Sequence, residues 1–359
     1  MTRIQKISLT QFKNYHSASF SFSERINCIV GANGTGKTNL LDAIYYLCYT
    51  KSYFSFLAQT SARHGTDGFR IQGTFIDNNE VETVVSCKWI AGKKEVWADG
   101  CLYEKLTDHI GKYAAVMIAP DDIELINEGS EIRRKWIDSI LGQVDRRYLE
   151  SILAYQRVLQ QRNAWLKLHH QNPPSKSVEL EYYDAQLARY GTYIYLQRQE
   201  FLKEFLQLLQ RFYAQLCEEK EVVLMTYHSD LHQMAALAIL QDNLYHDLRF
   251  QRTLKGIHKD ELTFLINGQE AKLYASQGQK KSLLFALKLA QHAYLKVRFG
   301  FAPILLLDDI FEKLDQHRMK SLLGIIVDSN FGQVFMTDTH EQRIKEAFDG
   351  LTEVHFILM

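Results

Sequence analysis

The sequence predicts an α/β fold in which α/β segments at the two ends of the chain bracket an inserted helical arm. Three observations lead to this prediction. A glycine-rich loop joins an apolar strand to a helix at residues 26–44, and a second apolar strand ends in two carboxylates at residues 304–309. The segment between them is mostly helical in period and composition. We therefore expect a split head, residues 1–119 and 256–359, and a helical arm domain, residues 120–255.

The composition of the 359 residues limits the classes of partner. Lys and Arg number 42, as do Asp and Glu, so any nucleic-acid site must be a local patch. The five cysteines form no C-x-x-C pair, which is typical of reduced thiols. No run of eighteen apolar residues occurs, and the N-terminus has no apolar signal segment. We expect a soluble, cytoplasmic protein with no membrane partner.

The segment Gly31–Thr38 matches the G-x-x-x-x-G-K-[ST] pattern of a phosphate loop. Its glycines permit positive φ, so successive N–H groups can surround phosphate oxygens, and the following helix adds its dipole. Lys37 is expected on the β- and γ-phosphates, and the Thr38 hydroxyl on Mg²⁺. The alternative is a glycine-rich turn that only joins strand to helix. The complete pattern between a strand and a helix favours a nucleoside triphosphate site.

Alternating apolar and polar residues predict strands at 3–10 and 17–22, before the buried strand 26–30. Three more strand-like segments, separated by turn residues, lie at 69–75, 81–90 and 94–97. We expect a small antiparallel sheet beside the nucleotide core, with another strand at 114–119.

The predicted arm begins after Pro120. Its helices are expected at 132–141, 149–168 and 178–216. The break at 172–175 contains two prolines and separates two long antiparallel helices.

Sheet signals return at 262–266, where Asn267-Gly268 predicts a hairpin turn. Beyond a helix at 276–297, the apolar strand 304–307 ends in Asp308-Asp309. In phosphate-loop enzymes the first acid holds Mg²⁺ and the next can polarise the attacking water. The alternative is that an aspartate pair at a strand end only begins a simple turn. The absence of an N-K-x-D motif favours adenine over guanine.

Ser276 and Gln279 have the spacing of a capping box at the start of the helix 276–297. This segment either only caps the helix or, with Gly278, forms a second phosphate site at a helix N-terminus. Because the chain already has a complete phosphate loop, a second site suggests that ATP is bound between two subunits.

Seven motifs in this order resemble the ABC-type ATPase heads of the SMC and Rad50 group and, more closely, the RecF family of bacterial recombination mediators. Three of the motifs are the phosphate loop, the S-x-G-Q segment at 276–279 and the L-L-L-D-D segment at 305–309. The other four lie at 9–15, 119–126, 133–138 and 256–262. The resemblance implies an ABC-type head with a flanking antiparallel subdomain and an inserted helical arm.

The resemblance also implies site roles. ATP and its metal would be bound by Gly31, Ala32, Asn33, Gly34, Thr35, Gly36, Lys37, Thr38 and Asn39. Asp308 would be the acid on the magnesium side, and Asp309 and Lys37 the catalytic residues. Because Asp309 stands where related ATPases carry Glu, slow hydrolysis is expected. Ser276, Gly278 and Gln279 would reach the γ-phosphate on the partner subunit.

Four other positions are interpreted from the same family. Asp315 falls in the loop used across the dimer, although Lys313 stands where family members often carry Glu. Lys13 lies where the SMC group places a basic residue near the nucleotide. His340 is a candidate γ-phosphate switch or a structural histidine near a strand end.

Basic residues cluster on the arm and near the S-x-G-Q segment, at Arg133, Arg134, Lys135, Arg146, Arg147, Arg157, Arg162, Arg252, Lys255, Lys259, Lys280 and Lys281. A solvated helix face also explains each of them. The resemblance implies phosphate contacts with double-stranded and gapped DNA, in a cleft closed when ATP drives homodimerisation.

The family resemblance implies DNA-stimulated ATP hydrolysis and recombinase loading with RecO and RecR, in recombinational repair and the SOS response. The alternatives are an ABC transporter ATPase, an SMC-like head with a nuclease partner, and a nucleotide-dependent binding protein with incidental turnover. The helical insertion and the lack of a glutamine loop argue against the transporter.

Overall fold

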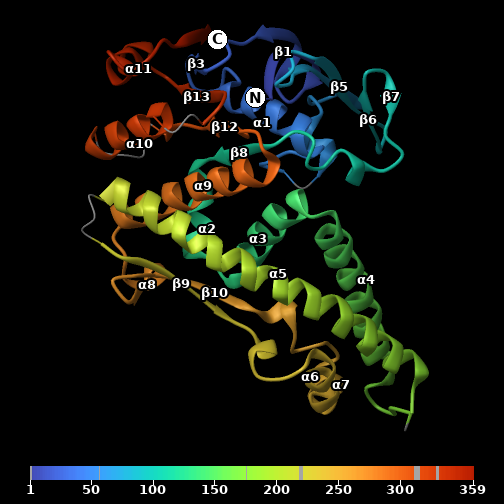
Figure 1. The fold of residues 1–359 in the computed structure, drawn as a ribbon. Coiled ribbons are helices and arrows are strands. Elements are labelled where there is room, and N and C mark those ends of the chain that lie inside the picture. Colours follow the sequence, from blue (N-terminus) through green and yellow to red (C-terminus); the bar gives the residue numbers. More distant parts are fainter. Residues whose placement is uncertain (1, 56, 175, 218–220, 311–315, 329–330) are drawn as a thin grey trace. The chain divides into compact units, whose positions relative to one another are not determined.

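The computed structural model describes residues 2–55, 57–174, 176–217, 221–310, 316–328 and 331–359 (Figure 1). Tertiary contacts divide the chain into two compact units. Unit 1 comprises the described residues of 1–122, 215–218 and 281–359, and unit 2 those of 123–214 and 219–280.

Unit 1 is built on a parallel sheet whose order, among the described residues, is β14-β3-β13-β12-β8. The strands are β3 (Ile26–Val30), β8 (Ala115–Ile118), β12 (Ile304–Leu307), β13 (Val334–Asp338) and β14 (His355–Leu358). All residues of β3, β8, β12 and β13 are buried, which explains why these strands are mostly apolar. The carboxyl ends of these strands meet at one edge, the usual ligand-binding edge of such sheets.

The predicted antiparallel sheet is confirmed, with the order β2-β1-β4-β5-β6-β7 in the described part of the chain. Its strands are β1 (Arg3–Phe12), β2 (Tyr15–Ser21), β4 (Gly68–Ile76), β5 (Glu82–Ile90), β6 (Lys93–Ala98) and β7 (Cys101–Leu102). One face packs on helix α1 (Lys37–Tyr49) around Ile7, Leu47 and Ile71. Gly73 lies at this contact, where a Cβ would come within 2.5 Å of the Leu47 side chain, so a larger residue would force Leu47 to shift.

Unit 1 also contains most of helix α9 (Gln277–Phe299), together with α10 (Gln316–Asp328) and α11 (Glu341–Phe348). Short 3-10 turns lie at η1 (Ala58–Ser61), η2 (Leu106–Asp108) and η3 (Pro120–Ile123). The five cysteines are free thiols, three of them buried. None of the helices in the described residues has an apolar stretch suited to spanning a bilayer.

Unit 2 is mainly helical. Its helices are α2 (Glu124–Asn127), α3 (Ser130–Val144), α4 (Arg146–His169), α5 (Val178–Cys217), α6 (Ala236–Asp242), α7 (Leu244–Phe250) and α8 (Ala271–Tyr274). The antiparallel pairing expected for the two long helices is confirmed (Figure 1). Tyr193 of α5 contacts Asp145 beside the start of α4, whereas Asp184, nearer the start of α5, contacts Arg162 late in α4.

A small antiparallel sheet completes unit 2. Its strands are β9 (Val223–His228), β10 (Glu261–Ile266) and β11 (Gln269–Glu270), and η4 (Asp230–His232) and η5 (Ile257–Lys259) are 3-10 turns nearby in sequence. The predicted hairpin at Asn267-Gly268 is confirmed by the pairing of β10 with β11. The strand β9 was not predicted from the sequence. It pairs with β10, and tertiary contacts group the described segment 256–280 with unit 2.

Two buried arginines connect segments of unit 2 that are distant in sequence. Arg162 donates to Asp184 at 2.7 Å and to Asp247 at 2.6 Å, and Arg198 donates to Asp260 at 2.9 Å. Removing one partner of such a pair leaves an uncompensated buried charge, at a cost of about 3–5 kcal/mol. Arg162 is therefore a structural residue, although its charge made it a candidate for DNA contact.

Candidate functional site

The phosphate loop connects β3 to α1. Gly34 and Gly36 have φ values of +84° and +112°, in the left-handed region that glycine tolerates. Helix α1 begins at Lys37, and no described side chain caps its first turn, so its N–H groups are available to an anion. The Lys37 ammonium donates to the carbonyls of Gly31 and Ala32 at 2.8 and 3.1 Å. The lysine is thereby held against the loop that it is predicted to serve.

Residues at the turn between β1 and β2 donate hydrogen bonds to carbonyls of the phosphate loop. Asn14 Nδ2 donates to the Thr35 carbonyl at 3.0 Å, and Asn39 Nδ2 donates to Asn14 Oδ1 at 2.8 Å. The Tyr15 hydroxyl donates to the Gly36 carbonyl at 3.0 Å. A Cβ at Gly36 would lie only 2.6 Å from Asn14 Nδ2, so glycine is needed for this approach. The sequence analysis cited Asn14 and Tyr15 only as part of a family motif and gave them no role.

Thr38 and Asp308 lie in direct contact although they are 270 residues apart in sequence. The Thr38 hydroxyl lies 2.9 and 3.0 Å from the two carboxylate oxygens of Asp308. Burial raises the pKa of the Asp308 carboxyl, whereas hydrogen bonds from Thr337 and Thr38 act to lower it. A hydroxyl beside a buried carboxylate supplies the oxygen ligands that Mg²⁺ prefers. The two side chains predicted to serve one metal are therefore adjacent.

Thr337, at the end of β13, joins the two carboxylates that follow β12. Its hydroxyl donates to Asp308 Oδ1 at 2.8 Å and accepts the Asp309 N–H at 2.9 Å. Asp309 has a φ of +46°, in a region that a non-glycine residue seldom adopts. Since Thr337 comes from the neighbouring strand, no local spacing in the sequence indicated this role.

His340 follows β13 and is mostly exposed, with 72% of its side chain accessible. Its Nδ1 lies 2.7 Å from the Thr339 hydroxyl, and its N–H donates to Asp338 Oδ1 at 2.7 Å. Arg343 donates to the same Asp338 oxygen at 2.8 Å. The imidazole is therefore accessible at the same sheet edge as the phosphate loop, and its switch role stays a prediction.

Lys13 makes an ion pair inside unit 1. Its ammonium lies 2.6 Å from Asp42 Oδ2, and this fully buried carboxylate also accepts from the Ser52 hydroxyl at 2.7 Å and the Tyr53 N–H at 2.6 Å. The contact connects the turn after β1 to helix α1. Lys13 therefore supports the position of the turn that carries Asn14.

The capping box at the start of α9 is confirmed. The Ser276 N–H donates to Gln279 Oε1 at 2.8 Å, and the Gln279 N–H donates to the Ser276 hydroxyl at 3.2 Å. Gln279 Nε2 also donates to Glu221 Oε1 at 2.7 Å, so the glutamine is fixed within unit 2. Ser276 itself is exposed. Asp315 and Lys313 lie outside the described residues.

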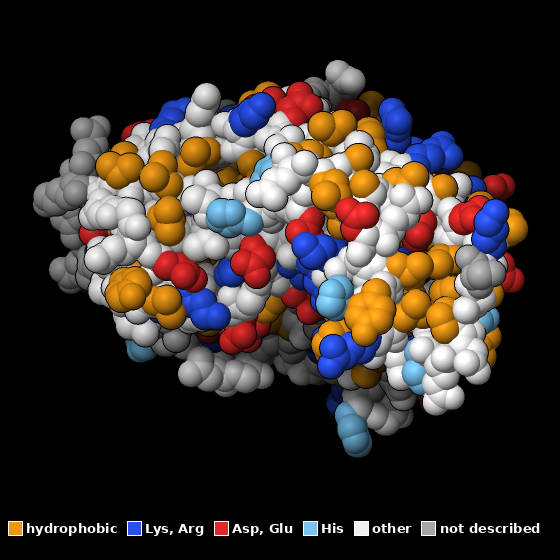
Figure 2. Space-filling model, turned by 90° about the horizontal axis from the view of Figure 1, so that it is seen from below, with side chains coloured by type: hydrophobic (Ala, Val, Ile, Leu, Met, Phe, Trp, Pro, Cys, Tyr) orange, Lys and Arg blue, Asp and Glu red, His pale blue; other side chains and the backbone are white. Residues whose placement is uncertain are grey.

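The structure divides the basic residues proposed for DNA contact into two groups. Those held by other groups of unit 2 are Arg133, Arg134, Lys135, Arg146, Arg162, Lys255 and Lys280. Those without an ion pair to a described carboxylate are Arg147, Arg157, Arg252, Lys259 and Lys281. On the face drawn in Figure 2, Lys and Arg are interspersed with acidic and apolar side chains. The second group therefore has no competing carboxylate partner among the described residues.

The parallel sheet, the phosphate loop and the carboxylates of β12 define the class of P-loop ATPase heads. The chain matches the RecF/RecN/SMC N terminal domain family over residues 3–357. It is 43% identical to the DNA replication and repair protein RecF of Flavobacterium johnsoniae, over 95% of each chain. It is 38% identical to that of Cytophaga hutchinsonii, over 98% of this chain and 93% of the relative. The chain belongs to the RecF family of DNA replication and repair proteins.

Solved structures agree with this assignment. The recombination mediator protein RecF, in a structure described as RecF-ATP in the RecFOR pathway, superposes with a TM-score of 0.87 at 27% identity, over 95% of this chain and 92% of that one. The Smc head domain of Pyrococcus furiosus reaches a TM-score of 0.57 at 17% identity, over 96% and 91%, and shows a shared fold alone. The predicted ABC-type ATPase head with an inserted helical arm is confirmed, and the alternatives of another ABC-type assembly are not favoured.

Proposed function

We propose that this chain binds ATP and Mg²⁺ at the phosphate loop and hydrolyses ATP slowly as a conformational switch. The observation that carries the proposal is the contact between Thr38 and Asp308, which joins the loop to the acidic strand end. The RecF relative whose structure contains ATP supports the choice of nucleotide. The loop residues Gly31–Asn39 would surround the triphosphate, and Lys37 would exchange its carbonyl contacts for phosphate oxygens.

The roles proposed for the two carboxylates differ. Asp308 and Thr38 would hold Mg²⁺, whose charge offsets that of the phosphates. Asp309 would orient the attacking water. Its position is set by the N–H contact to Thr337, but its side chain is shorter than the Glu of related ATPases, which supports slow turnover.

We further propose that ATP joins two copies of the chain. Ser276, Gly278 and Gln279 of one copy would bind the γ-phosphate held by the other, supported by the exposed Ser276 at a helix N-terminus. Asp315 would contribute across the dimer, and His340 would sense the γ-phosphate. An accessible imidazole at the same edge of the sheet as the loop supports that role.

The biological partners follow from the family. We propose that the dimer binds double-stranded and gapped DNA, acts with RecO and RecR in loading recombinase during recombinational repair and the SOS response, and works in the cytoplasm. The relatives named as DNA replication and repair proteins, and the RecF structure described in the RecFOR pathway, support these partners.

The test is ATP hydrolysis with and without gapped duplex DNA at two salt concentrations. We expect slow turnover that DNA accelerates, less so at high salt because phosphate contacts are screened. Lys37→Arg should abolish turnover, since a guanidinium does not reproduce the point contact of the ammonium. Equal hydrolysis rates with and without DNA would contradict the DNA-stimulated switch but not the proposed ATP binding.

A further inference from the structure

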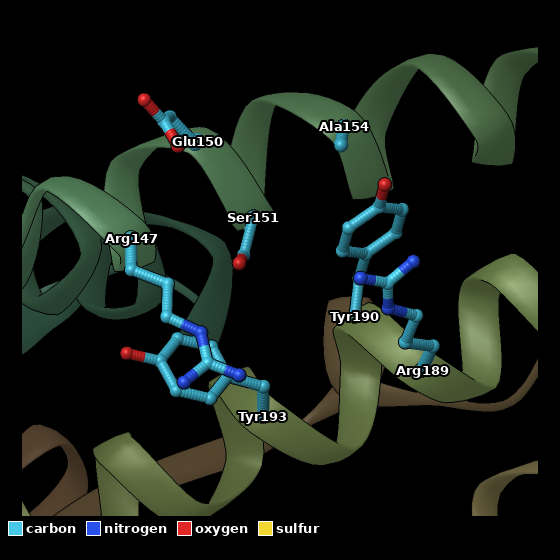
Figure 3. Close-up of a pocket in the computed structure, with 7 residues that line it drawn as sticks. All are labelled: Arg147, Glu150, Ser151, Ala154, Arg189, Tyr190 and Tyr193. Carbon is cyan, nitrogen blue, oxygen red and sulfur yellow. The ribbon is translucent and has the colours of Figure 1, made fainter.

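A pocket of about 370 Å³ opens between α4 and α5, wholly within unit 2 (Figure 3). Arg147 and Ser151 extend from α4 toward α5, and Arg189, Tyr190 and Tyr193 line the facing side. None of its lining residues belongs to the phosphate loop or to the S-x-G-Q segment. Arg189 was not among the basic residues proposed from the sequence.

Two arginines of this pocket have no acidic partner. Neither Arg147 nor Arg189 forms an ion pair with a carboxylate in the described part of the chain. Glu150, the acid that borders the pocket, points to the other side of α4 (Figure 3) and is 3.1 Å from Arg146. Both guanidinium groups are therefore available to an anion in a concave site.

The aromatic side chains hold this arrangement in place. The Arg147 guanidinium lies 4.2 Å from the Tyr193 ring centroid, and Arg189 lies 5.6 Å from that of Tyr190. Tyr193 is itself fixed, because its hydroxyl donates to Asp145 Oδ2 at 2.6 Å. A guanidinium that stacks on a ring keeps the N–H groups along its edge free to donate. Two of these N–H groups can bind two oxygens of one phosphate.

The floor of the pocket supplies one more donor. Ser151 is 7% exposed, and its hydroxyl has no hydrogen-bond partner among the described residues. Figure 3 shows it pointing toward α5, between the two arginines. Guanidinium forks, a hydroxyl and tyrosine rings are together the groups that bind nucleic-acid strands without reading sequence.

We propose that the α4–α5 pocket holds phosphates of the DNA backbone through Arg147, Arg189 and Ser151. This inference rests on the proposed DNA binding and assigns to it a site on the helical unit. Arg147 was one of several basic residues considered from the sequence, and the structure distinguishes it from its neighbour Arg146, which is paired with Glu150.

The test compares Arg147→Gln and Arg189→Gln with Arg146→Gln, which removes the same charge one residue outside the pocket. Affinity for a labelled gapped duplex is measured over a salt series with the full chain. Each pocket variant should bind several-fold more weakly and lower the slope of log affinity against log salt by about one. Arg146→Gln should leave that slope unchanged. Arg147→Lys should keep the slope, since it keeps the charge. ATP hydrolysis without DNA should be the same in all variants.

The outcomes separate the pocket from the proposed function. If the wild-type chain binds DNA and the pocket variants match Arg146→Gln, the pocket assignment is wrong and DNA binding stands. If the wild-type chain binds no DNA, both fail. A third outcome would assign the pocket to a free phosphate. Inorganic phosphate would raise the melting temperature of the wild-type chain but not of Arg147→Gln, and the DNA affinity of Arg147→Gln would be unchanged. This result would overturn the proposed DNA contact.

Discussion

Thr337 shows how a single hydroxyl positions two acids. Thr337→Val removes the acceptor of the Asp309 N–H and the donor to Asp308 while keeping the shape of the side chain. An unsatisfied buried polar group costs about 1–3 kcal/mol. We expect ATP turnover to fall roughly tenfold, which corresponds to about 1.4 kcal/mol in the barrier, and the Mg²⁺ concentration for half-maximal rate to rise. Steady-state hydrolysis over a Mg²⁺ series measures both.

Thr337→Ser is the matched control, since it keeps the hydroxyl and loses only a methyl group. It should retain most of the turnover and the wild-type Mg²⁺ dependence. Equal loss in both variants would show that packing at β13, and not the hydroxyl, supports the site.

The residues that the sequence analysis singled out carry their chemistry in local patterns, as Lys37, Thr38 and Asp308 do. Thr337 and Asn14 act through partners on other strands or loops. The contact of Thr337 exists because β12 and β13 are neighbours in the sheet, and that of Asn14 because the β1–β2 turn lies against the phosphate loop. Neither adjacency is encoded in residue spacing.

The β1–β2 turn is the element that braces the phosphate loop. Asn14→Ala removes the contacts to the Thr35 carbonyl and to Asn39. A hydrogen bond has a net value of about 1 kcal/mol. Loss of one contact should therefore lower ATP affinity several-fold, and loss of both, if each contributes its whole value to binding, up to about 30-fold. Titration of a fluorescent ATP analogue measures the change.

Asn79→Ala is a matched control in another turn, between β4 and β5, where the Asn79 N–H donates to Asp77 Oδ1. This variant should bind nucleotide as the wild type does. Unchanged affinity in Asn14→Ala would mean that the loop keeps its shape without the brace.

Most elements follow from their hydrophobic pattern, because a strand such as β12 is a continuous apolar run and α5 keeps its apolar stripe throughout. The strand β9 was missed. Only Val223 is buried among its six residues, so its sequence lacks a clear alternation. The strand pairs with β10, and tertiary contacts group the described segment 256–280 with unit 2, whereas the sequence predicts that the head resumes at residue 256.

At the scale of the whole molecule, the proposed dimer divides one ATP site between two copies. Ser276→Asp and Ser276→Asn test it as a pair, because Asn and Asp both cap helices about as well as Ser. Asp adds a negative charge opposite the γ-phosphate, and like charges 4 Å apart repel by about 1–4 kcal/mol between water and a protein surface. Ser276→Asp should therefore weaken ATP-dependent dimerisation at least about fivefold, while Ser276→Asn weakens it little. Sedimentation with and without ATP gives the result. Nucleotide binding by the monomer should be equal in both variants, and equal dimerisation would place Ser276 outside the shared site.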